Sequence, residues 1–218
     1  DGKTPNGVLE ELAAMPYMIK FLAPTTQESK DYFLKRGLEM AKSFGYTTAN
    51  EGRMFGPMHA VMADAAKRGL VDIDFIGWMD YTGRAELDKA FSTSYSNHYR
   101  LGGLKVTLDG SPQGRTAWLT EPYLIPPAGK GADHVGYPAM TDEEANRFVD
   151  QAFQNGWQIL VHCNGDAAAD QFIRAVRAAT AKHGPGDRRP VMIHAQTVRE
   201  DQLDAMKELG IIPSFFGM

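Results

Sequence analysis

The sequence predicts an α/β protein built around a parallel sheet, with a partial TIM (β/α)8 barrel as the favoured architecture. Six short apolar or alternating runs, which begin near residues 46, 71, 104, 157, 190 and 211, have the composition of strands, and most are followed by a helical pattern. Polar side chains fall at the ends of at least three of these runs, namely Lys105, His162 and His194. An open doubly wound sheet has the same alternation, but a site that gathers residues from many strands is typical of the barrel.

Composition and charge describe an ordinary globular chain. Its 218 residues are 43% hydrophobic and 23% charged, so it can bury a sizeable core. The net charge of −4, and the lack of a basic run longer than Arg188-Arg189, argue against a nucleic-acid partner. No apolar stretch approaches the ~20 residues of a membrane span, so no membrane association is expected. The single Cys163 excludes an internal disulfide; the compartment is left open, with the cytoplasm favoured.

The first half of the chain alternates between helical and strand patterns. A short helical stretch over 8–15 is expected to end at Pro16. Thr25 and Glu28 have the spacing of a capping box, and the helix they open is expected to end at Gly45. The pattern then predicts a strand over 46–50, a helix over 57–68, a strand over 71–78 and a helical stretch over 84–91.

The second half contains a long segment without periodicity. The predicted strand 104–108 places Lys105 where an inward-pointing side chain would be buried. Residues 109–139 are rich in glycine, proline and aromatic residues, and loops of about thirty residues in a compact domain are often functional. Thr141 and Glu144 form a second capping box. The elements that follow are a helix to 155, a strand over 157–162, a helix over 167–181, a strand over 190–194, a helix over 200–209 and a strand over 211–215.

Two histidines at the ends of neighbouring strands suggest a metal site. A single histidine there is more often a hydrogen-bonded structural residue. His162 and His194 are one βα unit apart, however, and adjacent strands lie ~5 Å apart, so both rings can reach one ion.

Lys105 also points to chemistry, because an isolated ammonium in a barrel core is costly. It is expected to be paired, deprotonated or modified; a neutral amine could form a Schiff base, or add carbon dioxide to become a carbamate that bridges two metals. Asp109 and Asp166 follow Lys105 and His162 and could orient ligands or move protons, or could equally be caps or loop anchors. Lys105 and Asp166 are the candidate catalytic residues.

Three motifs in order carry a resemblance to a known family. They are Leu104–Ser111 followed by Thr120–Tyr123, then Val161–Ala168, then Ile193–Gln196. This pattern resembles amidohydrolase family 3 of the metal-dependent hydrolase superfamily, which includes N-substituted formamide deformylases. Residues 5–11 and 212–216 look like that family too, so the resemblance covers nearly the whole chain.

The resemblance implies a (β/α)8 barrel that hydrolyses non-peptide amide bonds with metal-activated water. Lys105, as a carbamate, and His162 and His194 would be ligands of one or two divalent ions, with zinc favoured. The family's His-x-His pair, the aspartate of its eighth strand and its terminal β-sandwich have no counterpart in the sequence. Residues 1–218 are therefore expected to be one internal segment, about strands two to seven, without a complete site of its own.

The 109–139 loop is expected to select a small amide-like substrate. Trp118 and Tyr123 could line an apolar pocket and Arg115 could meet a carboxylate, although the aromatics could equally pack the loop. A homodimer is one expected assembly. The other four histidines, His59, His98, His134 and His183, are taken as surface residues.

Two other functions are left open. One is a Schiff-base lyase or aldolase barrel that uses Lys105 as an amine nucleophile. The other is a non-catalytic descendant that kept the barrel as a binding scaffold.

Overall fold

All six predicted strands form, and they lie in one parallel sheet in the order of the chain. The computed structural model describes residues 7, 9, 13–22 and 26–217. The strands are β1 (Thr48–Met54), β2 (Asp74–Asp80), β3 (Tyr99–Thr107), β4 (Gln158–Cys163), β5 (Val191–His194) and β6 (Ile212–Phe215). Each pairs in parallel with the next, in the order β1-β2-β3-β4-β5-β6. This sequential order, rather than a doubly wound one, confirms part of a (β/α)8 barrel.

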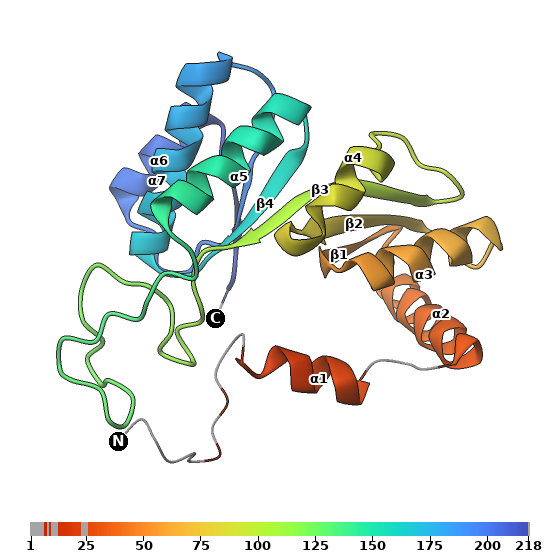
Figure 1. Ribbon diagram of the computed structural model, residues 1–218, viewed down its shortest axis with the longest axis horizontal. Helices are drawn as coiled ribbons and strands as arrows, with labels where there is room; N and C mark the ends of the chain where they lie inside the picture. Colours follow the sequence, from red (N-terminus) through yellow and green to blue (C-terminus); the bar gives the residue numbers. More distant parts are fainter. Residues whose placement is uncertain (1–6, 8, 10–12, 23–25, 218) are drawn as a thin grey trace.

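The helices that follow β1 connect the strands, and two further helices precede β1. They are α1 (Met15–Leu22), α2 (Gln27–Ser43), α3 (Gly56–Lys67), the 3-10 helix η2 (Tyr81–Glu86), α4 (Leu87–Ala90), α5 (Asp142–Asn155), α6 (Asp166–His183) and α7 (Glu200–Leu209). Figure 1 shows α5 and α6 packed beside β4 and α7 next to α6, with α3 and α4 beside the first three strands. Residues 108–141 contain no helix or strand and form the predicted loop, which leaves the carboxyl end of β3.

Local caps fix where the helices begin. The predicted capping box at α5 is confirmed, because Thr141 Oγ1 accepts from the Glu144 backbone and Glu144 accepts from the Thr141 backbone. The box predicted for α2 is wrong by one residue, since Thr26 is its cap. Thr25 and half of the predicted 8–15 helix, residues 8 and 10–12, lie outside the described residues. Pro16 does not end a helix but lies in the first turn of α1, where its missing N–H is tolerated.

The strand β3 begins five residues earlier than the sequence pattern indicates. Gly102 and Gly103 interrupt the apolar run, so the sequence pattern does not indicate a strand before residue 104. A Cβ on Gly103 would lie 2.0 Å from the carbonyl oxygen of Gln158, so glycine is needed for β4 to approach.

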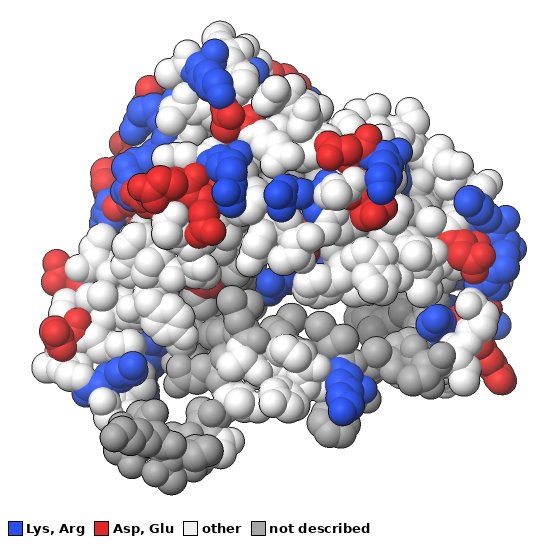
Figure 2. All heavy atoms as spheres, viewed as in Figure 1, with Lys and Arg blue, Asp and Glu red and all other residues white. Residues whose placement is uncertain are grey.

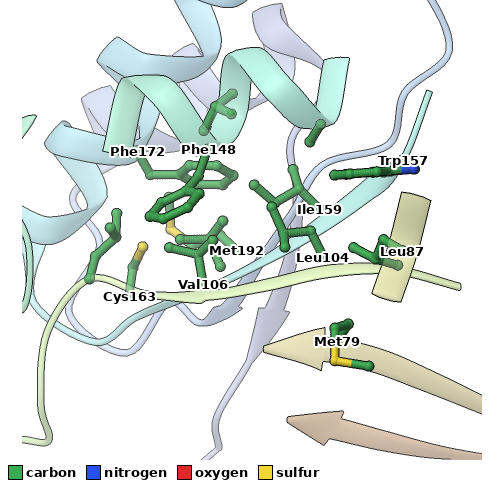
Figure 3. Close-up of a cluster of buried hydrophobic side chains, with 14 of the residues drawn as sticks. Met79, Leu87, Leu104, Val106, Phe148, Trp157, Ile159, Cys163, Phe172 and Met192 are labelled. Atoms are coloured by element: carbon green, nitrogen blue, oxygen red, sulfur yellow. The ribbon is translucent and has the colours of Figure 1, made fainter. Parts of the chain in front are cut away.

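The apolar core lies between the sheet and helices α5 and α6. Phe148 of α5 and Phe172 of α6 pack over Val106 and Met192 of the sheet (Figure 3). Because successive strand residues point to opposite faces, the neighbours of these core residues point away from the helices. Lys105 is such a neighbour of Val106. The face opposite the helices is the interior of the barrel.

The described surface carries both acidic and basic side chains (Figure 2). Acidic and basic side chains alternate over the face seen in Figure 2. Within the described ranges, no helix has the length and apolar character to cross a bilayer.

Replacing Phe172 with alanine is expected to lower the free energy of unfolding by about 3–5 kcal/mol, because the change empties a fully buried site between α6 and the sheet. Phe33→Ala is the matched control, since Phe33 is 61% exposed on α2, and its effect should stay below about 0.5 kcal/mol. Urea denaturation of both variants measures the difference. Equal effects would contradict the core described above.

Candidate metal centre

Three predicted ligand residues lie near the carboxyl ends of adjoining strands. Lys105 belongs to β3, His162 to β4, and His194 is the last residue of β5. The ring centroids of His162 and His194 are 4.6 Å apart, and the rings are at 81° to each other. Lys105 and His162 both act electrostatically on His194, so the three groups share one neighbourhood. The structure therefore brings them together.

Hydrogen bonds select one tautomer of His162. Its Nε2 lies 2.8 Å from the carbonyl oxygen of Gly110 and 3.4 Å from Oδ1 of Asp109. Asn164 Nδ2 also lies 3.2 Å from Nε2, but the shorter contact is to the Gly110 oxygen, an acceptor, so Nε2 carries the proton and donates to Gly110. The nearby Nδ2 of Asn164 donates to the same carbonyl oxygen at 2.8 Å. With Nε2 engaged in this way, Nδ1 is the ring atom available to a metal ion.

His194 is held by an unusual backbone. Its φ is 76° and that of Ala195 is 45°, a left-handed region that residues other than glycine rarely adopt. Two bonds fix this geometry: the Ala195 N–H donates to Cys163 O at 3.0 Å, and the Phe216 N–H to His194 O at 2.8 Å. Burial, together with the neighbouring His162 and Lys105, lowers the pKa of His194 to about 4. The imidazole is neutral at pH 7, which is the form that binds metals.

Lys105 is buried, as the sequence predicts, and only 6% exposed. Its Nζ donates to the carbonyl oxygen of Val106 at 2.9 Å. Burial lowers the pKa of Lys105 to about 8, and the Arg53 cation contributes to this lowering. The neutral amine is therefore more abundant at pH 7 than in an ordinary lysine, by about two orders of magnitude.

An ion pair next to Lys105 was not predicted from the sequence. Arg53 of β1 donates through Nε to Oδ2 of Asp80 in β2 at 2.8 Å, and the Asp80 side chain is fully buried. Asp80 is paired in register with Lys105. The sequence does contain one sign of this pair. Asp80 is an acidic residue two positions beyond the predicted end of the strand over 71–78.

Asp109 acts as an anchor for three backbone segments. Its Oδ1 accepts from the Asn164 N–H at 3.0 Å, and its Oδ2 accepts from Gly165 at 2.7 Å and Trp118 at 3.0 Å. The carboxylate also lies beside His162. The sequence left two roles open for Asp109: orienting ligands or moving protons, and capping or anchoring a loop. The structure shows the contacts of a loop anchor directly.

Asp166 lies in the first turn of α6 and also holds the loop. It accepts hydrogen bonds from the backbone and hydroxyl of Thr120, and Arg199 lies 2.8 Å from its Oδ2. Burial raises the pKa of Asp166, but these bonds outweigh burial and leave it below its usual value. The predicted catalytic role of Asp166 stays a prediction.

The three predicted substrate-binding residues belong to a loop that is packed onto the barrel. Trp118 packs against the core, and a Cβ on Gly165 would lie 1.8 Å from its carbonyl oxygen. The Tyr123 hydroxyl donates to Ala117 O at 2.9 Å, and burial raises the pKa of this phenol to about 12. Arg115 has a φ of 55°, and its carbonyl oxygen accepts from His134. Their contact with a substrate stays a prediction.

The other histidines have partners away from this centre. His59 contacts the Tyr99 hydroxyl at 2.7 Å, His98 contacts Asp74 at 2.9 Å and His183 contacts Asp150 at 2.7 Å. His98 is exposed and His59, His134 and His183 are partly exposed, and their assignment as surface residues stays a prediction.

The donor set fits part of a metal site. Two imidazoles face each other, and a buried amine adjoins them. In the described part of the chain, no three side chains of histidine, cysteine, aspartate or glutamate converge into a complete ligand set. Thr107, in register with His162, and Gln196, two residues beyond His194, each have a buried side-chain atom (Oγ1 and Nε2) without a hydrogen-bond partner among the described residues. A metal held here thus requires at least one further ligand, for which a carbamate on Lys105 is suitable.

Solved structures share this fold. An uncharacterized metal-dependent hydrolase from Pyrococcus furiosus superposes with a TM-score of 0.79 at 22% identity, over 94% of this chain and 42% of that one. Its counterpart from Pyrococcus horikoshii OT3 gives the same TM-score and identity, over 97% of this chain and 43% of that one. At such identity the likeness shows the fold alone. This chain spans less than half of either structure.

Two curated proteins and a family model match the sequence. YtcJ of Bacillus subtilis (strain 168), whose name assigns it provisionally to the amidohydrolases, is 30% identical over 114 residues, 52% of this chain and 20% of YtcJ. Protein LONG AFTER FAR-RED 3 of Arabidopsis thaliana is 30% identical over 114 residues, 52% of this chain and 19% of its own length. The model of the amidohydrolase family matches residues 1–218. The chain belongs to the amidohydrolase family.

Proposed function

We propose that the protein containing this chain is a metal-dependent hydrolase of carbon–nitrogen bonds in non-peptide amides. The observation that carries the proposal is the pairing of His162 and His194 beside the buried amine of Lys105. The two imidazoles would hold a divalent ion, for which zinc is well suited, and Lys105 would join them as a carbamate. When bound, such an ion would supply an activated water and polarise the scissile carbonyl.

The chain's own residues prepare this site. Gly110 O holds the His162 proton on Nε2 and leaves Nδ1 free, and burial keeps His194 neutral. The neutral amine of Lys105 would attack carbon dioxide, forming a nitrogen–carbon bond and releasing one proton to solvent. The product is an anion, which satisfies the need of a cation for a charged ligand in a buried site.

The long loop would form one wall of the substrate pocket. Asp109 and Asp166 tie residues 118 and 120 to the ends of β4 and α6, so the wall is fixed before substrate arrives. Leu124 is 97% exposed and Ile125 65% exposed on this loop, and they add apolar contact area to the proposed pocket residues Arg115, Trp118 and Tyr123.

One observation favours a second function. The lowered pKa of Lys105 is also what an amine nucleophile needs to form a Schiff base with a carbonyl substrate. That chemistry leaves the facing pair of imidazoles without a role, so hydrolysis is the function we favour.

His162→Ala and His194→Ala are each expected to remove bound zinc and amide hydrolysis, because each takes away one imidazole ligand. Elemental analysis after zinc loading and dialysis measures the metal. His98→Ala is the control, since His98 lies on the surface and contacts Asp74. Zinc content equal to that of the wild type in either site variant would count against the proposal.

Lys105→Arg keeps a positive charge but cannot add carbon dioxide. Native mass spectrometry in bicarbonate should show the mass of one carbon dioxide on the wild-type protein, and this mass should be absent from the variant together with activity. Borohydride reduction in the presence of a carbonyl substrate provides the opposite test. A stable adduct on Lys105 would favour the Schiff-base function instead.

Asp166→Asn removes the charge that Arg199 and Thr120 contact, so the 109–139 loop should become more sensitive to trypsin, with turnover falling as a consequence. Asp201→Asn is the control, because Asp201 also contacts Arg199 but is exposed. Lost turnover with unchanged loop cleavage would show instead that Asp166 acts in the chemistry, as the sequence predicts.

A further inference from the structure

The guanidinium of Arg53 is only partly used by the protein. Its Nε donates to Asp80 at 2.8 Å, but within the described ranges neither Nη group has a hydrogen-bond acceptor. Glu51 is the nearest acidic residue along β1, and its carboxylate accepts from the Arg53 backbone N–H at 3.0 Å. The Arg53 side chain is 28% exposed, so its two Nη groups can meet a ligand.

The orientation of Arg53 is fixed before any ligand arrives. Asp80 is fully buried, and its second oxygen accepts from the backbone and hydroxyl of Thr82 at 3.0 and 2.6 Å. The ring of Phe55 lies 5.6 Å from the Arg53 guanidinium carbon. A cation held in this way loses little further side-chain entropy when it binds.

Arg53 lies at the same end of the sheet as the proposed metal centre. Asp80, to which Arg53 donates, is the register partner of Lys105. Lys105 is only 6% exposed, whereas Arg53 reaches solvent. Of the two cations at this end of the sheet, Arg53 is therefore the one that a ligand from solvent can reach.

We propose that Arg53 binds a carboxylate of the substrate, so that the hydrolysed amide is one that carries a carboxylate near its scissile bond. The inference rests on the proposed function and names its substrate class. Two Nη groups match the two oxygens of a planar carboxylate, a geometry that arginine supplies and lysine does not. A carbamate on Lys105 is the competing anion for the same two groups, and the experiment separates the two cases.

The test measures equilibrium binding to the metal-free protein that contains this chain, in which no turnover occurs. The probes are a panel of N-acetyl amino acids, each matched with the N-acetyl amine that lacks only the carboxylate. Calorimetry should show that members with the carboxylate bind about tenfold to hundredfold more tightly. Arg53→Lys keeps a cation for buried Asp80 and should lose most of this preference. Arg36→Lys, at an exposed pair with Glu39, should retain it.

A second variant separates the loss of the carboxylate contact from the loss of the fold. Arg53→Met combined with Asp80→Asn removes both charges, so that no buried carboxylate is left unpaired, and it should also lose the preference. No preference in any wild-type pair, or a preference that survives in both variants, overturns the inference. The inference also fails if Arg53→Lys lowers carbon dioxide uptake by Lys105 while the ligand preference is unchanged. An Arg53-dependent preference without hydrolysis by the zinc-loaded protein supports the carboxylate site and contradicts only the proposed function.

Discussion

The buried carboxylate of Asp109 is the constraint on which the rest of the centre depends. It accepts backbone N–H groups from residues 118, 164 and 165, and it lies beside the ring of His162. One side chain thus joins the end of β3 to the end of β4 and to the long loop. A buried carboxylate without these donors would be costly, so the loop must close over it for the fold to be stable. The same contacts keep Gly110 O in place, and Gly110 O sets the tautomer of His162.

The barrel interior also has to accommodate several charges at one end. Arg53 and Asp80 form one pair, and Lys105 lies beside them with a carbonyl oxygen as its hydrogen-bond acceptor. Desolvation favours the neutral amine of Lys105 and the neutral ring of His194. Burial therefore keeps the His194 ring neutral at pH 7 and enlarges the neutral fraction of the Lys105 amine, although most of that amine is still protonated at this pH.

Much of the fold could be predicted because the strands are short, apolar and separated by clear helical patterns. Lys105, His162 and His194 were also predictable, since each ends or interrupts such a strand. Arg53 and Asp80 were not, because β1 is polar and the ion pair joins residues distant in the chain. The spacing of apolar residues predicted α2, but it did not predict which of them would be buried. Phe33 and Phe44 belong to that apolar pattern and are 61% and 74% exposed. Tertiary contacts decide such features, and local sequence does not record them.

The most direct measurement is a crystal structure of the zinc-loaded protein with an anomalous map at the zinc edge. We expect a peak bonded to Nδ1 of His162 and to the ring of His194, with continuous density for a carbamate beyond Nζ of Lys105. Gly110 O should still accept from Nε2 of His162. Zinc located elsewhere, or Nε2 of His162 turned away from Gly110 toward the metal, would contradict the centre described above.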